Sequence, residues 1–474
     1  MSDKVVAAPS VGEGSLKRSV GPTLLWGVGV GAVISGDYYG WNTGLDLTGY
    51  WGYLIAIAIM GLLYACLSAV IGELAAAIPH SGGAYAYVRT ALGRIWGYFA
   101  GVSVLLEFVF APVAVALAVG GYVHVLFPNV PIWLSAVVLY AVSTVVHLAG
   151  AGGSLKVEFL VTGLAVLGLV VFMAIGLPKA SLEHLNAYSS GAVFPHGIGG
   201  LWATLPYAAW FFFAIESLPM SAEEARNPGK DIPRALATAF ITLAVVGVGT
   251  LTVAAGVGDH HLPGATAPIT VALSNVIGAQ GWISPVIAVF SIIALVASFH
   301  AIVLAYSRQM FALSRARYLP TWISTLTRNQ VPLWGLVLPG LVGLVFVFVG
   351  TAMSDSIPVL VSLSVLVAAV SYILMMVAAL VLRRSRPDLN RPYRARGGKA
   401  TMWIGAVLSA VLIPAALWNV PLAFGIAVAV FALAFLLYMT YGRHRTANIS
   451  AEQELAALDA AEDALRTHTA PADL

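Results

Sequence analysis

Long runs of apolar residues, separated by short polar stretches, fill most of this chain. A helix that crosses a membrane needs about 20 mostly apolar residues, and twelve stretches meet or approach that length. Their soft boundaries are 22–46, 50–77, 96–126, 131–149, 155–176, 199–221, 235–257, 281–311, 333–350, 356–381, 402–418 and 420–441. The pattern predicts an all-α polytopic membrane protein with twelve transmembrane helices.

The basic residues divide unevenly between the predicted loops. If the N-terminus is cytoplasmic, all 24 lysines and arginines except Lys179 fall on the cytoplasmic side. Cytoplasmic loops carry such an excess, and omitting one span would destroy it. We therefore expect a protein of the cell (inner) membrane with both termini cytoplasmic. The predicted organisation is an N-terminal segment 1–21, a first bundle 22–176, a second bundle 199–381, two further helices within 402–441 and a tail 442–474.

Composition supports a membrane protein and argues against an enzyme. Hydrophobic residues make up 59% of the chain and charged residues only 9%, whereas soluble domains carry about 25% charged residues. The single cysteine, Cys66, excludes an intrachain disulfide and a cysteine-based metal site. The sequence contains no phosphate-binding loop, metal-binding histidine spacing or nucleophile elbow. We expect no metal, no cofactor and no nucleic-acid partner, and the sequence leaves the oligomeric state open.

The first predicted span interrupts its own apolar pattern. Ser35, Gly36 and Asp37 lie near its middle, and Tyr38 follows them. An ionisable side chain in mid-bilayer costs about 2.5–3.5 kcal/mol on insertion scales, which a simple anchor would not carry. We interpret this stretch as a broken helix whose freed backbone groups and carboxylate line a binding cavity.

A second span, 199–221, is interrupted in the same way. It contains Pro206, Glu216, Ser217 and Pro219, and proline inside a helix removes a hydrogen bond and kinks the chain. The two interrupted spans are the first and the sixth. Paired interruptions at matching positions of two five-helix halves indicate an inverted-repeat transporter with discontinuous helices 1 and 6.

The acidic residues separate by depth. Asp37, Glu107 and Glu216 lie near span centres, where ionisable groups usually mark a substrate or ion path. The alternative for each is a protonated, hydrogen-bonded structural carboxyl. Glu73 and Glu158 lie near cytoplasmic span ends, where side chains can reach water or form local salt bridges.

Because the deep charge is acidic, the cavity suits a cationic ligand. At about 4 Å and an effective dielectric constant near 20, an opposite charge contributes about 4 kcal/mol. Without that cation, an isolated carboxylate is expected to bind a proton instead. Substrate and proton would then compete, with Asp37, Glu107 and Glu158 as proton-coupling candidates. The sequence does not decide between proton and sodium.

Aromatic residues accompany these acids. Tyr38 belongs to the first break, Trp210 and Phe213 to the second, and Phe110 follows Glu107. Aromatic faces attract ammonium groups by about 0.5–2 kcal/mol each, although most such residues in a membrane protein only pack against lipid or core. We expect Tyr38 and Phe213 to contact the ligand because each adjoins a break.

Two stretches resemble the amino acid–polyamine–organocation permeases. FFFAIESLPMSAEEARNPGKDIPRA, over 211–235, is similar to the sixth-span signature of this superfamily, and IPHSGGAYAYVRTALGRIWGYFAG, over 78–101, to its first inside loop. The resemblance covers about the first 440 residues. It implies the five-plus-five inverted repeat fold with two extra C-terminal helices, and alternating access with proton coupling or exchange.

The first break departs from the amino acid carriers of that superfamily. Those carriers have a Gly-Ser-Gly-like turn whose backbone amides hold the substrate carboxylate, whereas Asp37 occupies a glycine position here. Asp37 would repel a carboxylate and attract an amine. The stretches ISGDYYGWNTGL and LLEFVFAPVAVALAVGGY (105–122) look most like the ethanolamine permeases.

These observations favour a secondary active transporter that imports a small primary amine without a carboxylate, with ethanolamine as the first choice. The alternatives are an amino acid or polyamine permease or exchanger of the same superfamily, and a membrane sensor or channel. The expected substrate-binding residues are Ser35, Gly36, Asp37, Tyr38, Glu107, Phe110, Trp210, Phe213, Glu216 and Ser217.

Overall fold

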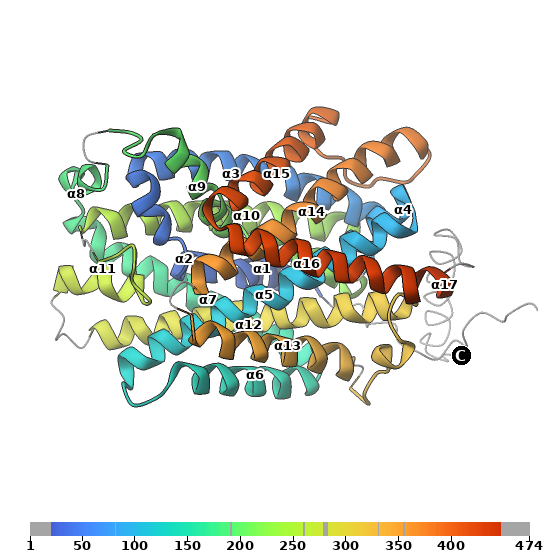
Figure 1. Cartoon of the computed structure of the whole chain (residues 1–474), viewed down its shortest axis with the longest axis horizontal. Helices are drawn as coiled ribbons and strands as arrows, with labels where there is room; N and C mark the ends of the chain where they lie inside the picture. Colours follow the sequence, from blue (N-terminus) through green and yellow to red (C-terminus); the bar gives the residue numbers. More distant parts are fainter. Residues whose placement is uncertain are drawn as a thin grey trace, which may run out of the picture.

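The computed structural model describes residues 20–446 except 81, 190–191, 259–260, 278–282, 330 and 354–355. Every regular element in that part of the chain is a helix (Figure 1), and the only β-type pairing there consists of two isolated bridges, Val20 with Ala225 and Leu326 with Pro332. The all-α prediction is therefore confirmed. The predicted segment 1–21 lies almost wholly, and the predicted tail 442–474 largely, outside the described residues.

Twelve elements or pairs of elements follow the twelve predicted spans. They are α1 (Pro22–Val33) with α2 (Ser35–Tyr38), α3 (Thr43–Ala77), α5 (Arg94–Leu126), α6 (Ile132–Leu148), α7 (Ala151–Gly176), α9 (Gly197–Trp210) with the 3-10 helix η2 (Ile215–Glu224), α10 (Pro228–Gly256), α12 (Ile283–Arg315), α13 (Leu333–Thr351), α14 (Ser356–Ser385), α15 (Lys399–Asn419) and α16 (Pro421–Leu437). The shorter helices α4 (Ala84–Leu92), α8 (Leu182–Ala187) and α11 (Pro268–Ile277) lie between them, and α17 (Arg443–Arg445) follows the last one.

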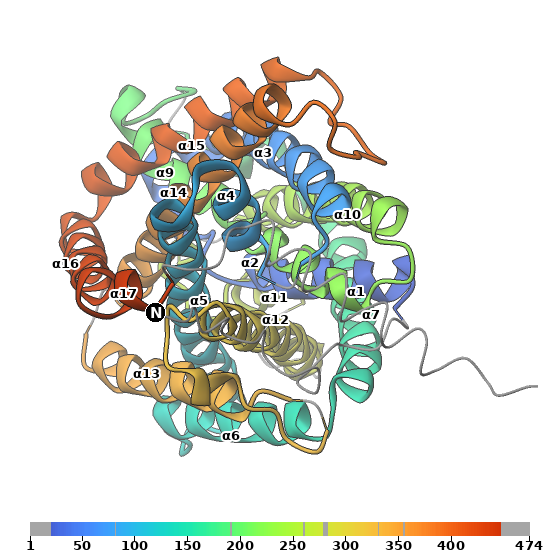
Figure 2. The ribbon, with the colours of Figure 1, turned by 90° about the vertical axis from the view of Figure 1, so that its right-hand side faces the viewer.

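Ten spans among the described residues are long and apolar enough to cross a membrane. The other two elements are shorter, since α1 has 12 residues and α6 has 17. The count of twelve crossings thus stays a prediction. Seen down the helix axes (Figure 2), α5 and α12 run inside the bundle, whereas α16 lies at its edge. The burial of the side chains agrees with these positions. In the most apolar part of α5, 89% of the residues are buried inside the protein, whereas in the segment Pro421–Arg445, which contains α16, only 22% are buried.

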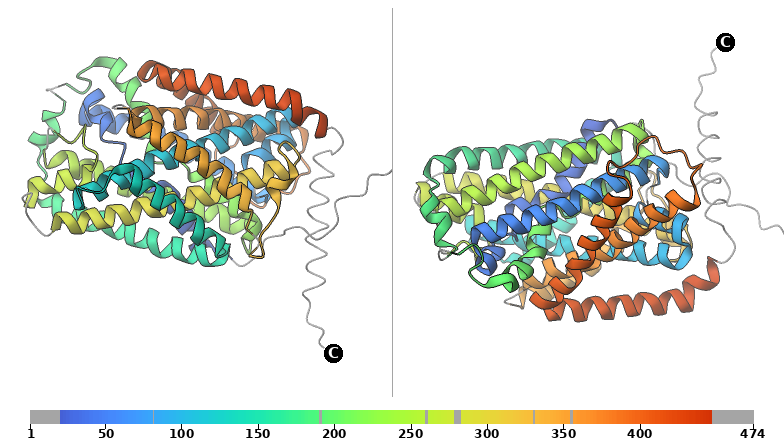
Figure 3. Two further views of the ribbon diagram at one scale, coloured as in Figure 1. Left: turned by 60° about the horizontal axis from the view of Figure 1, so that its bottom comes forward. Right: turned by 90° about the horizontal axis from the view of Figure 1, so that it is seen from above.

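The order of elements repeats along the chain. A broken helix (α1/α2 or α9/η2) is followed by a long helix (α3 or α10), a short helix (α4 or α11) and a second long helix (α5 or α12). The two long helices that follow the breaks, α3 and α10, lie side by side (Figure 3). This order agrees with two equivalent halves, while the inverted relation between the halves and their bounds stay predictions.

The loop between α14 and α15 is tied to α3 by a buried carboxylate. Glu73 accepts hydrogen bonds from Arg383 Nε at 2.8 Å and Nη2 at 2.5 Å, and from the backbone amide of Ala395 at 2.7 Å. Arg391 adds a contact of 3.6 Å. The local salt bridge expected for Glu73 is therefore present, and it fixes the ends of three segments to one another.

Candidate functional site

The first helix unwinds a few residues later than the sequence pattern indicates. The backbone stays in the right-handed helical region at Ile34, and Ser35–Tyr38 form one further turn. Tyr39 is then extended, at φ −160° and ψ 151°, and Gly40 has φ +91°. The prediction that the break lies at 35–37 is corrected to 39–42, because Gly40 can adopt a backbone conformation that other residues avoid.

The second break also differs from its prediction. Pro206 lies inside α9 without ending it, and the helix stops only at Trp210. Phe211–Phe213 form a turn, and Ala214 takes a left-handed conformation at φ 74° before η2 begins. A non-glycine residue held there costs about 1–3 kcal/mol, and such strain persists only where the surroundings impose it.

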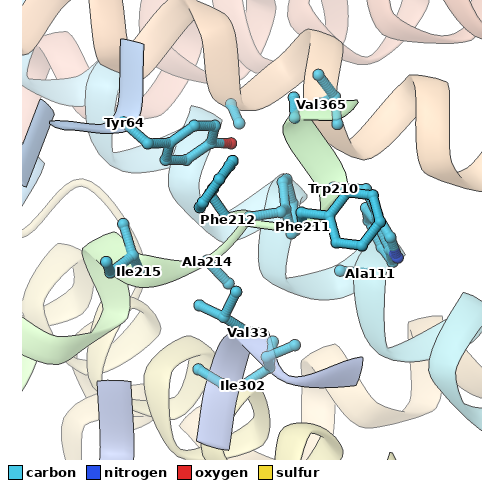
Figure 4. Packing of buried hydrophobic residues seen from close by; sticks show 14 of the residues in the cluster. Val33, Tyr64, Ala111, Trp210, Phe211, Phe212, Ala214, Ile215, Ile302 and Val365 are labelled. Carbon is cyan, nitrogen blue, oxygen red and sulfur yellow. The ribbon is translucent and has the colours of Figure 1, made fainter. Parts of the chain in front are cut away.

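The two breaks contact each other directly. Trp210 donates from Nε1 to the carbonyl of Tyr39 at 3.0 Å. Gly36 packs against the backbone carbonyl of Trp210 so closely that a Cβ atom would not fit there. Figure 4 shows Phe212 of the second break beside Tyr64 of α3, and Trp210 on the other side of Phe211, near Ala111 of α5.

Ser35 and Tyr38 are held by the surrounding helices. The hydroxyl of Ser298, on α12, lies 2.7 Å from the hydroxyl of Ser35 and 2.6 Å from the carbonyl of Ala32. Tyr38 donates to the carbonyl of Ala165 on α7 at 2.7 Å, and its own carbonyl accepts from Tyr122 at 3.1 Å. These bonds fix α2 against α5, α7 and α12.

Asp37 is fully buried, with 0% of its surface exposed. None of the described protein groups donates a hydrogen bond to either carboxylate oxygen. The side chain points toward α10, where a Cβ on Gly247 would lie 2.8 Å from Oδ1 and 2.8 Å from a ring carbon of Phe211. Asp37 thus faces neither lipid nor an arginine, and its carboxyl group has no cationic partner among the described side chains.

Glu107 and Glu216 form a separate acidic pair. Both are buried, at 0% and 4% exposed, and their carboxyl groups lie within hydrogen-bonding reach of each other. Tyr372 donates to Oε1 of Glu216 at 2.9 Å, and the hydroxyl of Tyr64 lies 3.4 Å from that of Tyr372. The structure therefore joins these two acids with each other and not with Asp37.

The expectation that Glu158 can reach water is wrong. Its exposure is 2%, because α1 covers this face of α7. Thr162 donates to the carbonyl of Gly27 at 3.1 Å and lies 3.3 Å from Oε1 of Glu158, while Oε2 has no described partner. The carboxyl can approach α1 because Gly31 has no side chain.

The predicted aromatic residues divide between two places. Trp210 and Phe213 stack on each other, with ring centroids 4.8 Å apart. Phe110 instead packs edge-on against Phe346 of α13, at 5.1 Å, in a second apolar cluster. The expectation that Phe110 lines the same site as Trp210 is therefore wrong, since Phe110 belongs to this second cluster and Trp210 to the main core. Ser217, which follows Glu216, is buried and its hydroxyl has no described partner.

Several residues of this region were missed by the sequence analysis. Phe211 stacks on Trp41 at 6.1 Å and adjoins Asp37. Gly247, Ser298 and Tyr372 come from distant spans. The signal for these three was weak, because each is a small or polar residue in a long apolar run, and Phe211 is one of three consecutive phenylalanines. Among the described residues, no group of three or more His, Cys, Asp or Glu side chains could hold a metal ion.

Comparisons with known proteins agree with this architecture. The amino acid permease family model matches residues 26–449. An uncharacterized transporter of Mycobacterium tuberculosis is 30% identical over 67% of this chain and 70% of its own. The branched-chain amino acid permease BcaP of Bacillus subtilis is 25% identical over 83% and 86%. The aromatic amino acid transport protein AroP of Escherichia coli is 22% identical over 76% and 80%.

Proposed function

Because the chain belongs to the amino acid permease family, we propose that it is a secondary active transporter that imports a small primary amine without a carboxylate. Ethanolamine is the substrate that we favour. The observation that carries the proposal is the carboxylate of Asp37, which is buried at the first break and has no described partner.

The charge of Asp37 sets the preference between amines and amino acids. An ammonium group about 4 Å from a carboxylate gains about 4 kcal/mol at an effective dielectric constant near 20, and a substrate carboxylate at the same distance would lose as much. An amino acid carries both charges, so it would need a separate group for its carboxylate. Ethanolamine carries only the ammonium group and a hydroxyl.

Other groups at the two breaks are suited to the rest of such a substrate. The hydroxyl of Ser217, which has no described partner, and the unwound backbone of the two breaks offer polar groups for the substrate hydroxyl, while Ser35 and Gly36 support the turn that carries Asp37. The rings of Tyr38, Trp210 and Phe213 would cover the carbon atoms. Polar backbone at membrane depth is tolerated where it is buried in protein or lines a cavity, and the contact between the breaks supplies such a place.

Proton coupling is part of the proposal, with sodium as the other coupling ion to be tested. The candidate groups are Asp37, Glu107 and Glu158, which are all buried carboxyls on spans of the first half. The distribution of Lys and Arg supports cytoplasmic termini, and uptake across the cell membrane is part of the proposal.

A second candidate is transport of an amino acid, because BcaP and AroP are named as amino acid transporters. Uptake of labelled ethanolamine into proteoliposomes separates the two. We expect saturable uptake that builds a concentration gradient, with weak competition from alanine. Strong competition by alanine would favour an amino acid permease, and strong competition by putrescine a polyamine permease. If the concentration of ethanolamine inside the proteoliposomes never exceeds the concentration outside, the protein is a channel. If ethanolamine binds but is not taken up, the protein is a sensor.

A further inference from the structure

We propose that Glu107 and Glu216 act as one proton-binding unit, in which two carboxyl groups share a single proton that is exchanged during transport. This inference rests on the proposed function, because it assigns the coupled proton of that transport cycle. It moves the coupling site from a single residue to a pair whose members come from the two halves of the chain.

The first support is the geometry of the pair. Glu107 comes from α5 and Glu216 from η2, and the two carboxyl groups face each other with no measurable exposure for Glu107 and 4% for Glu216. Both oxygens of Glu107 and Oε2 of Glu216 receive no hydrogen bond from a described donor. The hydroxyl of Tyr372 donates to Oε1 of Glu216 at 2.9 Å and also lies within reach of Glu107.

The second support is the chemistry of two acids in contact. An ionised carboxylate only accepts hydrogen bonds, so two carboxylates can bond to each other only when one of them is protonated. Like charges at this separation cannot both ionise in a buried place. At least one proton therefore stays with the pair, and either carboxyl group can hold it; the proposal is that the number is one.

No cation replaces that proton among the described side chains. The ionisable groups that face the pair are Tyr64 from α3 and Tyr372 from α14. Both are phenols, which donate hydrogen bonds while neutral at physiological pH. No described lysine, arginine or histidine bonds to either carboxyl. The charge of the pair consequently depends on the proton alone.

The position of Glu216 links the proton to the second break. Glu216 follows Ala214, whose left-handed backbone marks the unwound turn, by two residues. With the proton in place, the pair joins η2 to α5, and Tyr372 joins it to α14. Loss of the proton would put two negative charges in contact, so it is favourable only when the carboxyl groups separate and this junction opens. Protonation therefore biases the broken segment toward the packed arrangement.

The functional test uses the full chain in proteoliposomes. We compare ethanolamine uptake with and without an inward proton gradient for the wild type, Glu107→Gln, Glu216→Gln and the double variant. We expect the gradient to accelerate the wild type several-fold and to have no effect on any of the three variants. The double variant should be no worse than either single variant, because residues that act as one unit are not additive.

The matched control is Glu183→Gln, which changes an exposed glutamate on α8 and should respond to the gradient as the wild type does. A gradient response that survives in Glu107→Gln or Glu216→Gln would overturn the proposal, as would losses that multiply in the double variant. Acceleration of the wild type by a sodium gradient instead of a proton gradient would overturn it as well.

A second measurement needs no substrate, so it separates this inference from the proposed function. We subtract the infrared spectrum of the double variant from that of the wild type at neutral pH. We expect the difference spectrum to contain the bands of one protonated carboxylic acid and of one carboxylate. Bands of two acids, or of two carboxylates, would overturn the proposal. If the double variant does not fold, the infrared pH titration of each single variant should lack one carboxyl protonation step of the wild type and shift a second one. If the wild type takes up no amine, the proposed function fails, and the spectra still decide on the shared proton.

Discussion

The side chain of Asp37 carries the chemical preference of the candidate site. A charge taken out of water costs several kcal/mol unless a partner compensates it, and the described protein atoms offer Asp37 none. An ammonium group supplies both a counter-charge and three hydrogen-bond donors. A buried carboxylate without a partner is therefore a poor stabiliser of the fold and a good receptor for a small cation.

Because Gly247 has no side chain, the carboxyl group of Asp37 fits against α10. The substitution Gly247→Ala tests this close packing of Asp37 on Gly247. The new methyl group would lie 2.8 Å from Oδ1 of Asp37 and 2.8 Å from the ring of Phe211. We expect the carboxylate to be displaced and the affinity for ethanolamine to fall roughly tenfold or more, which corresponds to about 1.4 kcal/mol. Concentration-dependent uptake measures this change.

Gly163→Ala is the control for that substitution. Gly163 lies on α7 with nothing near its Cβ position, so alanine should leave the affinity unchanged. If Gly247→Ala transports with the wild-type affinity, the carboxylate does not bind substrate where the structure places it.

At the scale of single elements, the two broken helices are the features that the sequence predicts best. Both breaks are recognisable from polar and small residues inside apolar runs. Their positions are less predictable, because the first lies at Tyr39 and Gly40 and the second at Phe211–Ala214. Phe211, Phe212 and Phe213 give no local sign of a turn. The turn forms because it packs against α1 and α3, and that packing cannot be read from the segment itself.

Gly40→Ala tests the conformation of the first break. Alanine at φ +91° is strained, and its Cβ would lie 2.9 Å from Nε1 of Trp210. We expect a loss of about 1–3 kcal/mol of stability and a weaker contact between the breaks. Cys66 is the single cysteine and is buried, so a thiol-reactive dye reports thermal unfolding directly.

The control is Gly199→Ala on α9, where no positive φ and no neighbour opposes a Cβ atom. It should unfold at the wild-type temperature or slightly above, since alanine favours a helix over glycine by about 1 kcal/mol. Equal unfolding temperatures for Gly40→Ala and Gly199→Ala would contradict the conformation assigned to Gly40.

At the scale of the whole molecule, the sequence predicts which segments cross the membrane and not which side chains meet. The length and hydropathy of the apolar runs predict the spans, and the distribution of the basic residues predicts that their number is even. The contact of Glu107 with Glu216 depends on how α5 packs against η2, and the separation of Phe110 from Trp210 depends on the rotation of α5. Neither the packing of α5 against η2 nor the rotation of α5 about its axis can be predicted from a local sequence pattern.

The junction at Glu73 joins α3, α14 and the loop before α15, and Glu73→Ala tests its contribution to stability. Removal of the carboxylate leaves Arg383 and Arg391 without a counter-charge, although both keep bonds to backbone carbonyls, so the loss should be below the cost of about 3–5 kcal/mol for a fully buried pair. We expect a clearly lower unfolding temperature, measured with the same dye. Glu183→Ala, an exposed change on α8, should unfold like the wild type, and an equal temperature for Glu73→Ala would show that the junction contributes little.

The central claim is that Asp37 binds the ammonium group of the substrate, and a thermal-shift titration with ethanolamine on purified wild type and Asp37→Asn tests it most directly. A ligand that binds only the folded state raises the unfolding temperature with its concentration. We expect ethanolamine to stabilise the wild type and the control Asp46→Asn, which changes an exposed carboxyl of α3, and ethylene glycol to stabilise neither. Asp37→Asn should show no shift with ethanolamine, whereas a shift equal to that of the wild type would contradict the claim.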